Sequence, residues 1–388
     1  MPMTSLFRHQ DYAETPPTSP HYVVRPGSYP AVGSDEFRHR MQRVGRVLRE
    51  AGVQQIYLAH GTFVGTDALG VLAELARVFP AASTAVRRVI KRIVDRLAGE
   101  AGNYTMSYAR QFENALQAEG EPAIPVKLFY WSSENHHIGR ADGAVRLIDE
   151  LAAADVPRER RMLLWGHSHA GNVFALMSTL LGGERDAVER FFAAAEIYYR
   201  WPVIGCVDIP VWNRVRGLLR NDLPLGGARL DMVTFGTPIR YGWNASGYDR
   251  LLHFIHHRPA AGIPEYRAPF PPKVDDVLSA RHGDYIQQLG IAGTNVTPSM
   301  LSWRARVADH RLADLLQGAA VERSLAERFK AGVIVPDEGT SLLVDYGPPD
   351  GNIAEHLAGH AVYTQQQWML FHAEEVASRF YADRCESA

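Results

Sequence analysis

One short stretch of the chain constrains its fold more than any other. An apolar run at residues 162–165 enters the turn Gly-His-Ser-His-Ala-Gly at residues 166–171, and a second apolar run at residues 173–181 leaves it. This pattern predicts a buried strand, a sharp turn and a helix. Small residues are needed two positions before and after the central serine, Ser168, because the two backbones pass close together there. The chain meets this requirement with a glycine and an alanine. The turn would therefore lift the Ser168 hydroxyl above the carboxyl end of a sheet.

Composition limits the class of protein. The chain has 388 residues, of which 46% are hydrophobic, and a net charge of −2. It can therefore bury a large core, and its charge gives no reason to expect a nucleic-acid partner. The two cysteines, Cys206 and Cys385, favour a reducing compartment, although a single bridge between them stays open. We expect a cytoplasmic protein, because residues 1–20 lack the apolar core of a secretory signal and no apolar run reaches 18 residues.

Strands that alternate with helices predict the fold class. We expect strands at residues 55–59, 126–131, 162–165, 230–235, 251–255 and 341–344. We expect helices at residues 35–49, 141–154, 173–181 and 364–381. Such alternation predicts an α/β protein with a mostly parallel central sheet and helices on both faces. Residues 1–34 are expected to form an extended arm, and residues 35–388 one domain with helical insertions at about 64–120 and 184–228. The second insertion is rich in aromatic residues, and either a lid or ordinary core packing would account for it.

A second turn follows the first predicted strand of the domain. It has the sequence His60-Gly61-Thr62-Phe63. Acyl transfer requires N–H donors that face the developing oxyanion, and one of them normally follows the nucleophile, here at His169. We assign the second donor to Thr62, with Phe63 as the alternative. Gly61, Phe63 and His167 are expected to line the substrate site.

Together these motifs resemble the α/β-hydrolase fold family of serine esterases and lipases. The resemblance covers about residues 53–385 and rests on the two turns and on Thr234-Phe235-Gly236-Thr237-Pro238, which follows the strand after the serine helix. It implies a nucleophile, acid and histidine in that order along the chain, and no cofactor. Two features depart from the family pattern: Ala170 replaces the more usual glycine, and the insertions are long.

The resemblance places the catalytic histidine between the last strand and the last helix. His360 and His356 both lie there, and we favour His360 because the small residues Gly359 and Ala361 give its imidazole room. A general base is needed because a serine hydroxyl is inert alone. His372 falls inside the predicted final helix, where a packing or surface role is expected.

The triad acid should follow the strand at 251–255, because the carboxyl ends of parallel strands form the active face. This argument excludes Asp231 and Asp249, which lie at the beginnings of their strands. We favour Asp284 because His282-Gly283-Asp284-Tyr285 reads as a turn. The carboxylates that stay open as alternatives are Asp275, Asp276, Asp345 and Asp350.

For three further patterns in the sequence, we favour a structural role over a functional one. Residues 132–137 border the predicted active face, and a capped helix start explains them, with Arg140 as a partner for Glu134. The His167-x-His169 spacing is typical of some metal sites, but no carboxylate follows it closely, so we expect no metal. The basic helix at residues 87–96 fits a solvated helix face better than contact with an anionic membrane surface.

The sequence therefore predicts a carboxylic ester hydrolase that acts on a small-molecule or lipid ester. Ser168 would attack the carbonyl carbon, His360 would act as general base and then general acid, and Asp284 would orient His360. Two alternatives stay open at this point. The first is an acyltransferase or thioesterase with the same residues, and the second is a binding module that does not catalyse a reaction.

Overall fold

The computed structural model describes most of the chain. The described residues are 7, 16–61, 102–200, 209–269, 274–292, 298, 302–316, 332–349 and 356–382. None of the helices among them is long and apolar enough to cross a lipid bilayer. The basic segment at residues 87–96, the two cysteines and most of the first predicted insertion lie outside these ranges.

Seven strands of the described residues form one parallel sheet. Its order is β1-β7-β6-β5-β4-β2-β3. The strands are β1 (His21–Val24), β2 (Val53–Ala59), β3 (Val126–Phe129), β4 (Arg161–His167), β5 (Arg229–Phe235), β6 (Arg250–His256) and β7 (Thr340–Val344). This sheet confirms the predicted α/β class.

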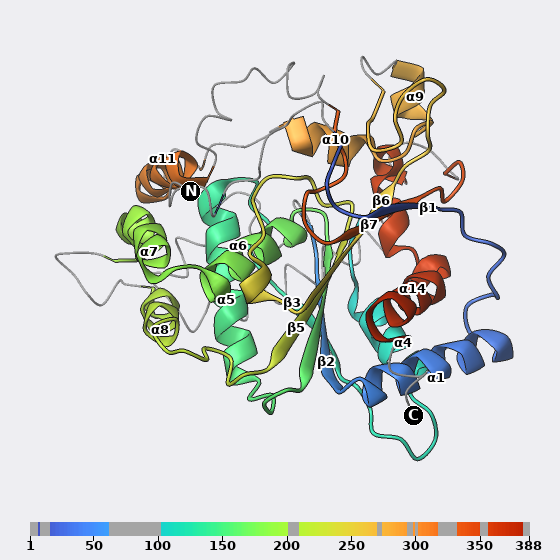
Figure 1. Cartoon of the computed structure of the whole chain (residues 1–388), viewed down its shortest axis with the longest axis horizontal. Helices are drawn as coiled ribbons and strands as arrows, with labels where there is room; N and C mark the ends of the chain where they lie inside the picture. Colours follow the sequence, from blue (N-terminus) through green and yellow to red (C-terminus); the bar gives the residue numbers. More distant parts are fainter. Residues whose placement is uncertain are drawn as a thin grey trace.

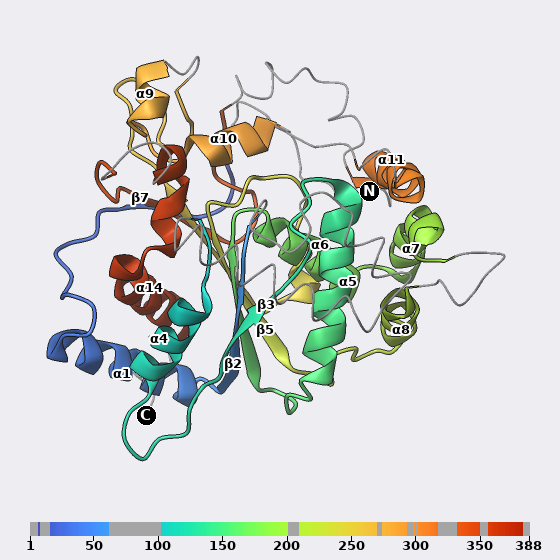
Figure 2. The same cartoon turned by 180° about the vertical axis from the view of Figure 1, so that it is seen from behind.

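Helices cover both faces of the sheet (Figures 1 and 2). One layer contains α1 (Asp35–Glu50), α4 (Met106–Leu116) and α14 (Met369–Tyr381). The other contains α5 (His137–Ala153), α6 (Ala170–Gly182), α7 (Arg185–Tyr199), α8 (Pro210–Leu218) and α11 (Trp303–Leu316). At one end of the sheet lie the short helices α9 (Val274–Leu278) and α10 (Tyr285–Ala292). Two 3₁₀ segments, Leu357–Thr364 and Gln366–Trp368, lead into α14, and a third is Ala245–Gly247.

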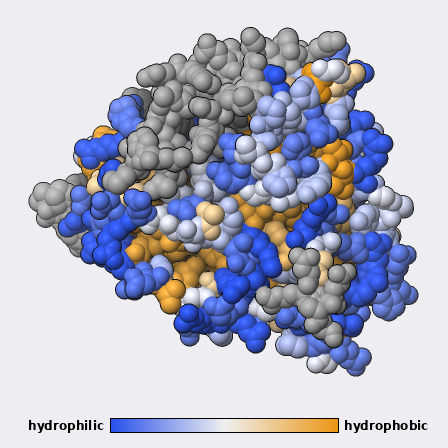
Figure 3. Space-filling model, viewed as in Figure 1, coloured by the Kyte–Doolittle hydropathy of each residue, from blue (hydrophilic) through white to orange (hydrophobic). Residues whose placement is uncertain are grey.

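Each central strand is buried on both faces. In β4, Met162 and Leu164 belong to the core beneath α5 and α6, whereas Leu163 and Trp165 belong to the core beneath α1, α4 and α14. Alternation of this kind follows from the two-residue period of a strand, and apolar residues at every position are typical of a sheet covered on both faces. Figure 3 shows one face of the molecule, whose coloured surface is mostly hydrophilic, with hydrophobic patches toward the middle.

The direction of the strand order reverses beside β4. The chain passes from β2 to the edge strand β3 and then returns across β2 to β4, after which β5, β6 and β7 continue in the other direction. Ligands of open parallel sheets bind at such a reversal, outside the carboxyl ends of the strands. Ala59 of β2 pairs in register with Gly166 of β4, so both strands end at the same level. The two turns singled out in the sequence therefore lie side by side at this end of the sheet.

The N-terminal arm contains structure that the sequence patterns did not predict. His21–Val24 forms β1, which pairs with β7 at one edge of the sheet. Phe7 is buried and stacks on Phe191 of α7, with ring centroids 5.6 Å apart. In the second predicted insertion, residues 184–228, α7 and α8 are the described helices.

Candidate active site

Ser168 occupies a sharp turn between β4 and α6. Its φ is 56°, in the left-handed region that costs a non-glycine residue about 1 to 3 kcal/mol. Neighbouring groups fix this conformation: the Ser168 N–H donates to the Phe235 carbonyl at 2.8 Å, and the Thr237 hydroxyl donates to the Ser168 carbonyl at 2.8 Å. Residues held in such conformations concentrate at functional sites.

Close contacts explain why small residues flank Ser168. A Cβ atom on Gly166 would lie 2.5 Å from the Phe174 ring, and one on Gly171 would lie 2.1 Å from the Thr237 hydroxyl oxygen. Ala170 is fully buried and its own Cβ is accommodated. The alanine that departs from the family pattern therefore fits, because the close approach to Thr237 occurs one position later.

The turn after β2 lies directly against the serine. A Cβ atom on Gly61 would lie 2.5 Å from the Ser168 Cβ and 3.1 Å from its Oγ. The Ser133 hydroxyl, which follows β3, donates to the Gly61 carbonyl at 2.7 Å and lies 2.8 Å from Nδ1 of His60. This contact fixes the Gly61 peptide group beside Ser168. Thr62 and Phe63, the predicted oxyanion and substrate contacts of this turn, lie outside the described residues.

His360 lies in the 3₁₀ segment that precedes α14. The three residues before it, Leu357, Ala358 and Gly359, all have left-handed φ angles of 47°, 50° and 92°. Its ring centroid lies 4.5 Å from that of His167, the residue before the serine, and Nε2 of His167 lies 3.2 Å from the His360 carbonyl. The reversed backbone thus brings His360 next to the Ser168 turn.

Asp284 is the carboxylate that meets His360. Its Oδ2 lies 2.7 Å from Nδ1 of His360, and both side chains are almost fully buried. Its Oδ1 accepts the Gln287 N–H at 2.8 Å, which makes Asp284 the residue that caps helix α10.

The other carboxylates have different partners or lie elsewhere. Asp345 pairs with Arg25 and Arg258, and Asp276 pairs with Arg281, whereas Asp275 is exposed at the start of α9. Asp350 lies outside the described residues. Asp231 and Asp249 both pair with Arg161 at the opposite end of the strands.

The remaining histidines of this region have packing contacts. His372 is fully buried in α14 and lies 2.7 Å from the Tyr346 hydroxyl. His356 is buried at the start of the 3₁₀ segment, and among the described residues it makes no hydrogen bond to Asp284. The segment after β3 caps α5 through His136, and Arg140 bonds to Asn135 at 2.9 Å.

Burial dominates the electrostatics around the serine. The pKa of His167 is lowered well below its ordinary value, first by desolvation and then by the neighbouring His360. The pKa of His169 is lowered in the same way by desolvation, with further contributions from Arg140 and Arg240. Both histidines are therefore neutral near pH 7, so neither adds a positive charge beside Ser168.

The described residues hold no hydrogen bond between the Ser168 hydroxyl and the His360 ring. Both residues are almost fully buried. In unliganded enzymes such bonds are often long and tighten when substrate binds. His167, one of the expected substrate contacts, is 1% exposed and supports the His360 backbone.

Sequence reasoning missed two partners of Asp284. The Tyr363 hydroxyl donates to Oδ2 at 3.1 Å, and the Gln287 N–H donates to Oδ1. The spacing Asp-x-x-Gln at residues 284–287 is a helix-capping signal that could have identified the second partner. No sequence signal identifies Tyr363, because its contact with Asp284 depends on how two distant segments fold together.

Comparison with protein-family models, curated proteins and solved structures found no significant match for this chain. A functional assignment therefore rests on its own residues.

Proposed function

We propose that this chain is a serine hydrolase of the α/β-hydrolase type that cleaves carboxylic esters. The observation that carries the proposal is the short His360–Asp284 hydrogen bond beside a serine in a left-handed turn at the carboxyl end of a central strand. Its location at the strand-order reversal of the sheet, where ligands of such folds bind, supports the proposal.

In the proposed reaction, the Ser168 Oγ attacks the ester carbonyl carbon while Nε2 of His360 takes the hydroxyl proton. The tetrahedral intermediate then collapses, and the alcohol leaves with that proton. A water molecule repeats the sequence on the acyl-enzyme, releases the acid and restores Ser168. Asp284 accepts the hydrogen bond from Nδ1 of His360 throughout, which selects the tautomer that can accept a proton at Nε2.

The oxyanion requires donors that face the carbonyl oxygen. The N–H of His169 lies at the N-terminal end of α6, where first-turn N–H groups have no partner within a helix and the helix dipole favours negative charge. We assign the second donor to Thr62, which follows the glycine that abuts Ser168. A side chain at position 61 would collide with Ser168. Because glycine has none, the space beside the Ser168 hydroxyl stays free for a substrate carbonyl group.

A covalent probe tests the proposal most directly. We expect a fluorophosphonate to add one adduct to the wild-type chain, measured by intact mass, and none to Ser168→Ala. The matched control is Ser178→Ala in the same helix, whose hydroxyl is fully buried and bonds to the Ala175 carbonyl. Ser168→Ala should also lower kcat for an activated aryl ester by at least about 10³-fold. A wild-type chain that takes up no adduct and turns over no ester contradicts the proposal.

The same experiment separates the alternatives. If added alcohols or thiols appear in the products in place of free acid, the chain transfers acyl groups to those acceptors and is not primarily a hydrolase. If neither adduct nor turnover is found, the interpretation as a binding module gains support.

A further inference from the structure

The Tyr363 hydroxyl bridges the pair Asp284–His360 to the end of strand β6. It accepts the backbone N–H of His256 at 2.7 Å and lies 3.1 Å from Oδ2 of Asp284. The Tyr363 oxygen accepts the His256 N–H, and the hydroxyl proton remains free to be donated to the Asp284 carboxylate. The same Oδ2 lies 2.7 Å from Nδ1 of His360, so one oxygen serves both partners.

A second bond completes a closed ring. The Asp284 N–H donates to the His256 carbonyl at 3.0 Å, so both backbone groups of His256 are engaged, one with Asp284 and one with Tyr363. Nδ1 of His256 also lies 3.1 Å from the Gly359 carbonyl, directly before His360. The end of β6 therefore holds Asp284 together with the segment that carries His360, Leu357–Thr364.

The backbone leaves space for this arrangement. A Cβ atom on Gly236, whose φ is 57°, would lie 2.4 Å from the Tyr363 ring and 2.7 Å from Oδ2 of Asp284. A Cβ atom on Gly283, whose φ is 111°, would lie 2.1 Å from the His256 carbonyl oxygen. Glycine in a left-handed conformation is thus required on two sides of the ring of hydrogen bonds.

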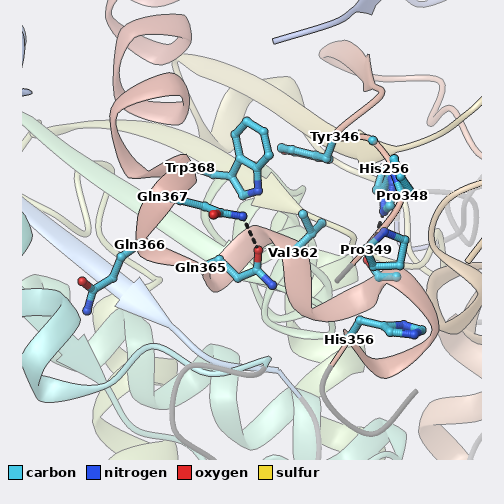
Figure 4. A pocket seen from close by; sticks show the side chains of 12 residues that line it. His256, Tyr346, Pro348, Pro349, His356, Val362, Gln365, Gln366, Gln367 and Trp368 are labelled. Atoms are coloured by element: carbon cyan, nitrogen blue, oxygen red, sulfur yellow. Dashed lines mark hydrogen bonds between the residues drawn. The ribbon is translucent and has the colours of Figure 1, made fainter. Parts of the chain in front are cut away.

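A cavity borders the segment that carries His360. Its volume is about 380 Å³, and the residues that line it include His256, Tyr346, Gly359, Val362 and Trp368. Figure 4 shows the side chains of Tyr346, Val362 and Trp368 around it.

We propose that Tyr363 is a positioning residue for the reaction, whose hydroxyl holds the Asp284 carboxylate directed at His360. The inference rests on the proposed function, because it assigns a role within that triad. Burial raises the pKa of Tyr363 well above its ordinary value, which keeps the hydroxyl protonated as a donor. The titratable groups that face it are Asp284, Tyr346, His256, His167 and His360.

The test compares Tyr363→Phe with Tyr346→Phe. Tyr346 is a matched control, because it is buried beside Tyr363 and its hydroxyl bonds to His372 and not to Asp284. We expect Tyr363→Phe to lower kcat for an aryl ester about tenfold, a fraction of the 10²–10⁴ that general acid–base catalysis supplies, with KM within about twofold of wild type. Tyr346→Phe should leave both constants close to wild type.

A pH profile distinguishes positioning from simple loss of structure. Without the hydroxyl, more negative charge stays on Asp284 and stabilises protonated His360. The acid limb of the kcat/KM profile should therefore move to higher pH in Tyr363→Phe. Profiles of wild type and Tyr363→Phe that superimpose would overturn the proposal, even if the rate falls.

A spectroscopic readout keeps the inference independent of turnover. The Nδ1 proton of His360, observed by NMR with ¹⁵N-labelled histidine, should shift downfield in Tyr363→Phe, because Asp284 becomes a stronger acceptor. It should be unchanged in Tyr346→Phe and absent in Asp284→Asn. If the wild type proves inactive but this pattern holds, the proposed function fails while the hydrogen-bond role of Tyr363 stands. An identical signal in wild type and Tyr363→Phe overturns that role.

Discussion

Ser168 stores conformational strain at a position where its chemistry is proposed to occur. Its left-handed backbone is imposed by the turn between β4 and α6, and bonds from Phe235 and Thr237 hold it. An ordinary side chain lowers stability in that conformation, whereas glycine adopts it freely. A chain selected for stability alone would have glycine there.

This reasoning predicts that Ser168→Gly is more stable than Ser168→Ala by about 1 kcal/mol, although both remove the hydroxyl. Urea denaturation of the two variants measures the difference. Ser178, inside helix α6, supplies the control, because there Ser178→Gly should be less stable than Ser178→Ala by about 1 kcal/mol. Equal stability of the two Ser168 variants would mean that the turn carries no strain.

At the scale of elements, one buried cluster joins β4, β5 and α14 far from the proposed active site. Nη1 of Arg161 bonds to both carboxylate oxygens of Asp231 at 2.9 and 3.0 Å, and the Tyr381 hydroxyl donates to Oδ2 at 2.7 Å. Arg161 and Asp231 are almost completely buried, whereas Asp249, the second partner of Arg161, is about one-third exposed. Loss of one partner from a buried pair leaves the other charge uncompensated.

We therefore expect Asp231→Ala to lower the free energy of unfolding by about 3 to 5 kcal/mol. Asp249→Ala should lower it by no more than about 1 kcal/mol, because solvent screens the partly exposed carboxylate. Chemical denaturation followed by circular dichroism compares the two. Similar losses in both variants would show that burial does not decide the contribution of this cluster.

The sequence predicted those strands that contain a recognisable run of apolar residues. The apolar runs of β2, β4, β5, β6 and β7 predicted strands close to their observed bounds, because strands covered on both faces consist mostly of apolar residues. β1 was missed, since only four residues form it and its partner β7 lies near the other end of the chain. The final helix was expected from Thr364, but α14 begins at Met369 because Gln365 is extended after the 3₁₀ segment.

The candidate site was predictable only in part. The pattern around Ser168 is local, so the serine, its turn and its small neighbours could be read from consecutive residues. The pairing of His360 with Asp284 joins segments that are 76 positions apart, and five carboxylates stayed open until distances in space were available. The roles of these residues in a reaction stay a prediction, which the probe and pH experiments test.

At the scale of the whole molecule, buried histidines set the response to acid. Burial lowers the pKa of His253 and His257 to about 4 and that of His372 to about 3. In the unfolded chain each titrates near 6.5, so the unfolded state binds more protons below that pH. The contribution of these histidines, which are buried in the neutral form, to the free energy of unfolding is therefore fully present above pH 6.5. It is lost as the pH falls below that value. Glu338 opposes this trend, because burial raises its pKa to about 7 and its contribution is lost as the pH rises through that value.

Among the described residues, burial lowers the pKa of seven histidines and raises that of four carboxyls, so we predict that the free energy of unfolding falls from pH 6.5 to 5. His372→Gln should reduce the slope by about 1.4 kcal/mol per pH unit, the contribution of one proton. Urea denaturation at several pH values measures the slopes, with the exposed His39 of α1 replaced by Gln as control. Parallel stability curves for wild type and His372→Gln would contradict the assignment.

The edge position of β1 has a consequence for synthesis on the ribosome. His21 pairs with Ser341, so the strand made first among the seven must wait until the strand made last has emerged. The strands from β2 to β7 need no contribution from β1 to pair with one another, and they can assemble while the early segment stays free. Attachment of β1 to the growing protein is thus the closing step of sheet formation, and a nascent chain stalled before residue 340 would keep its first strand accessible to proteases.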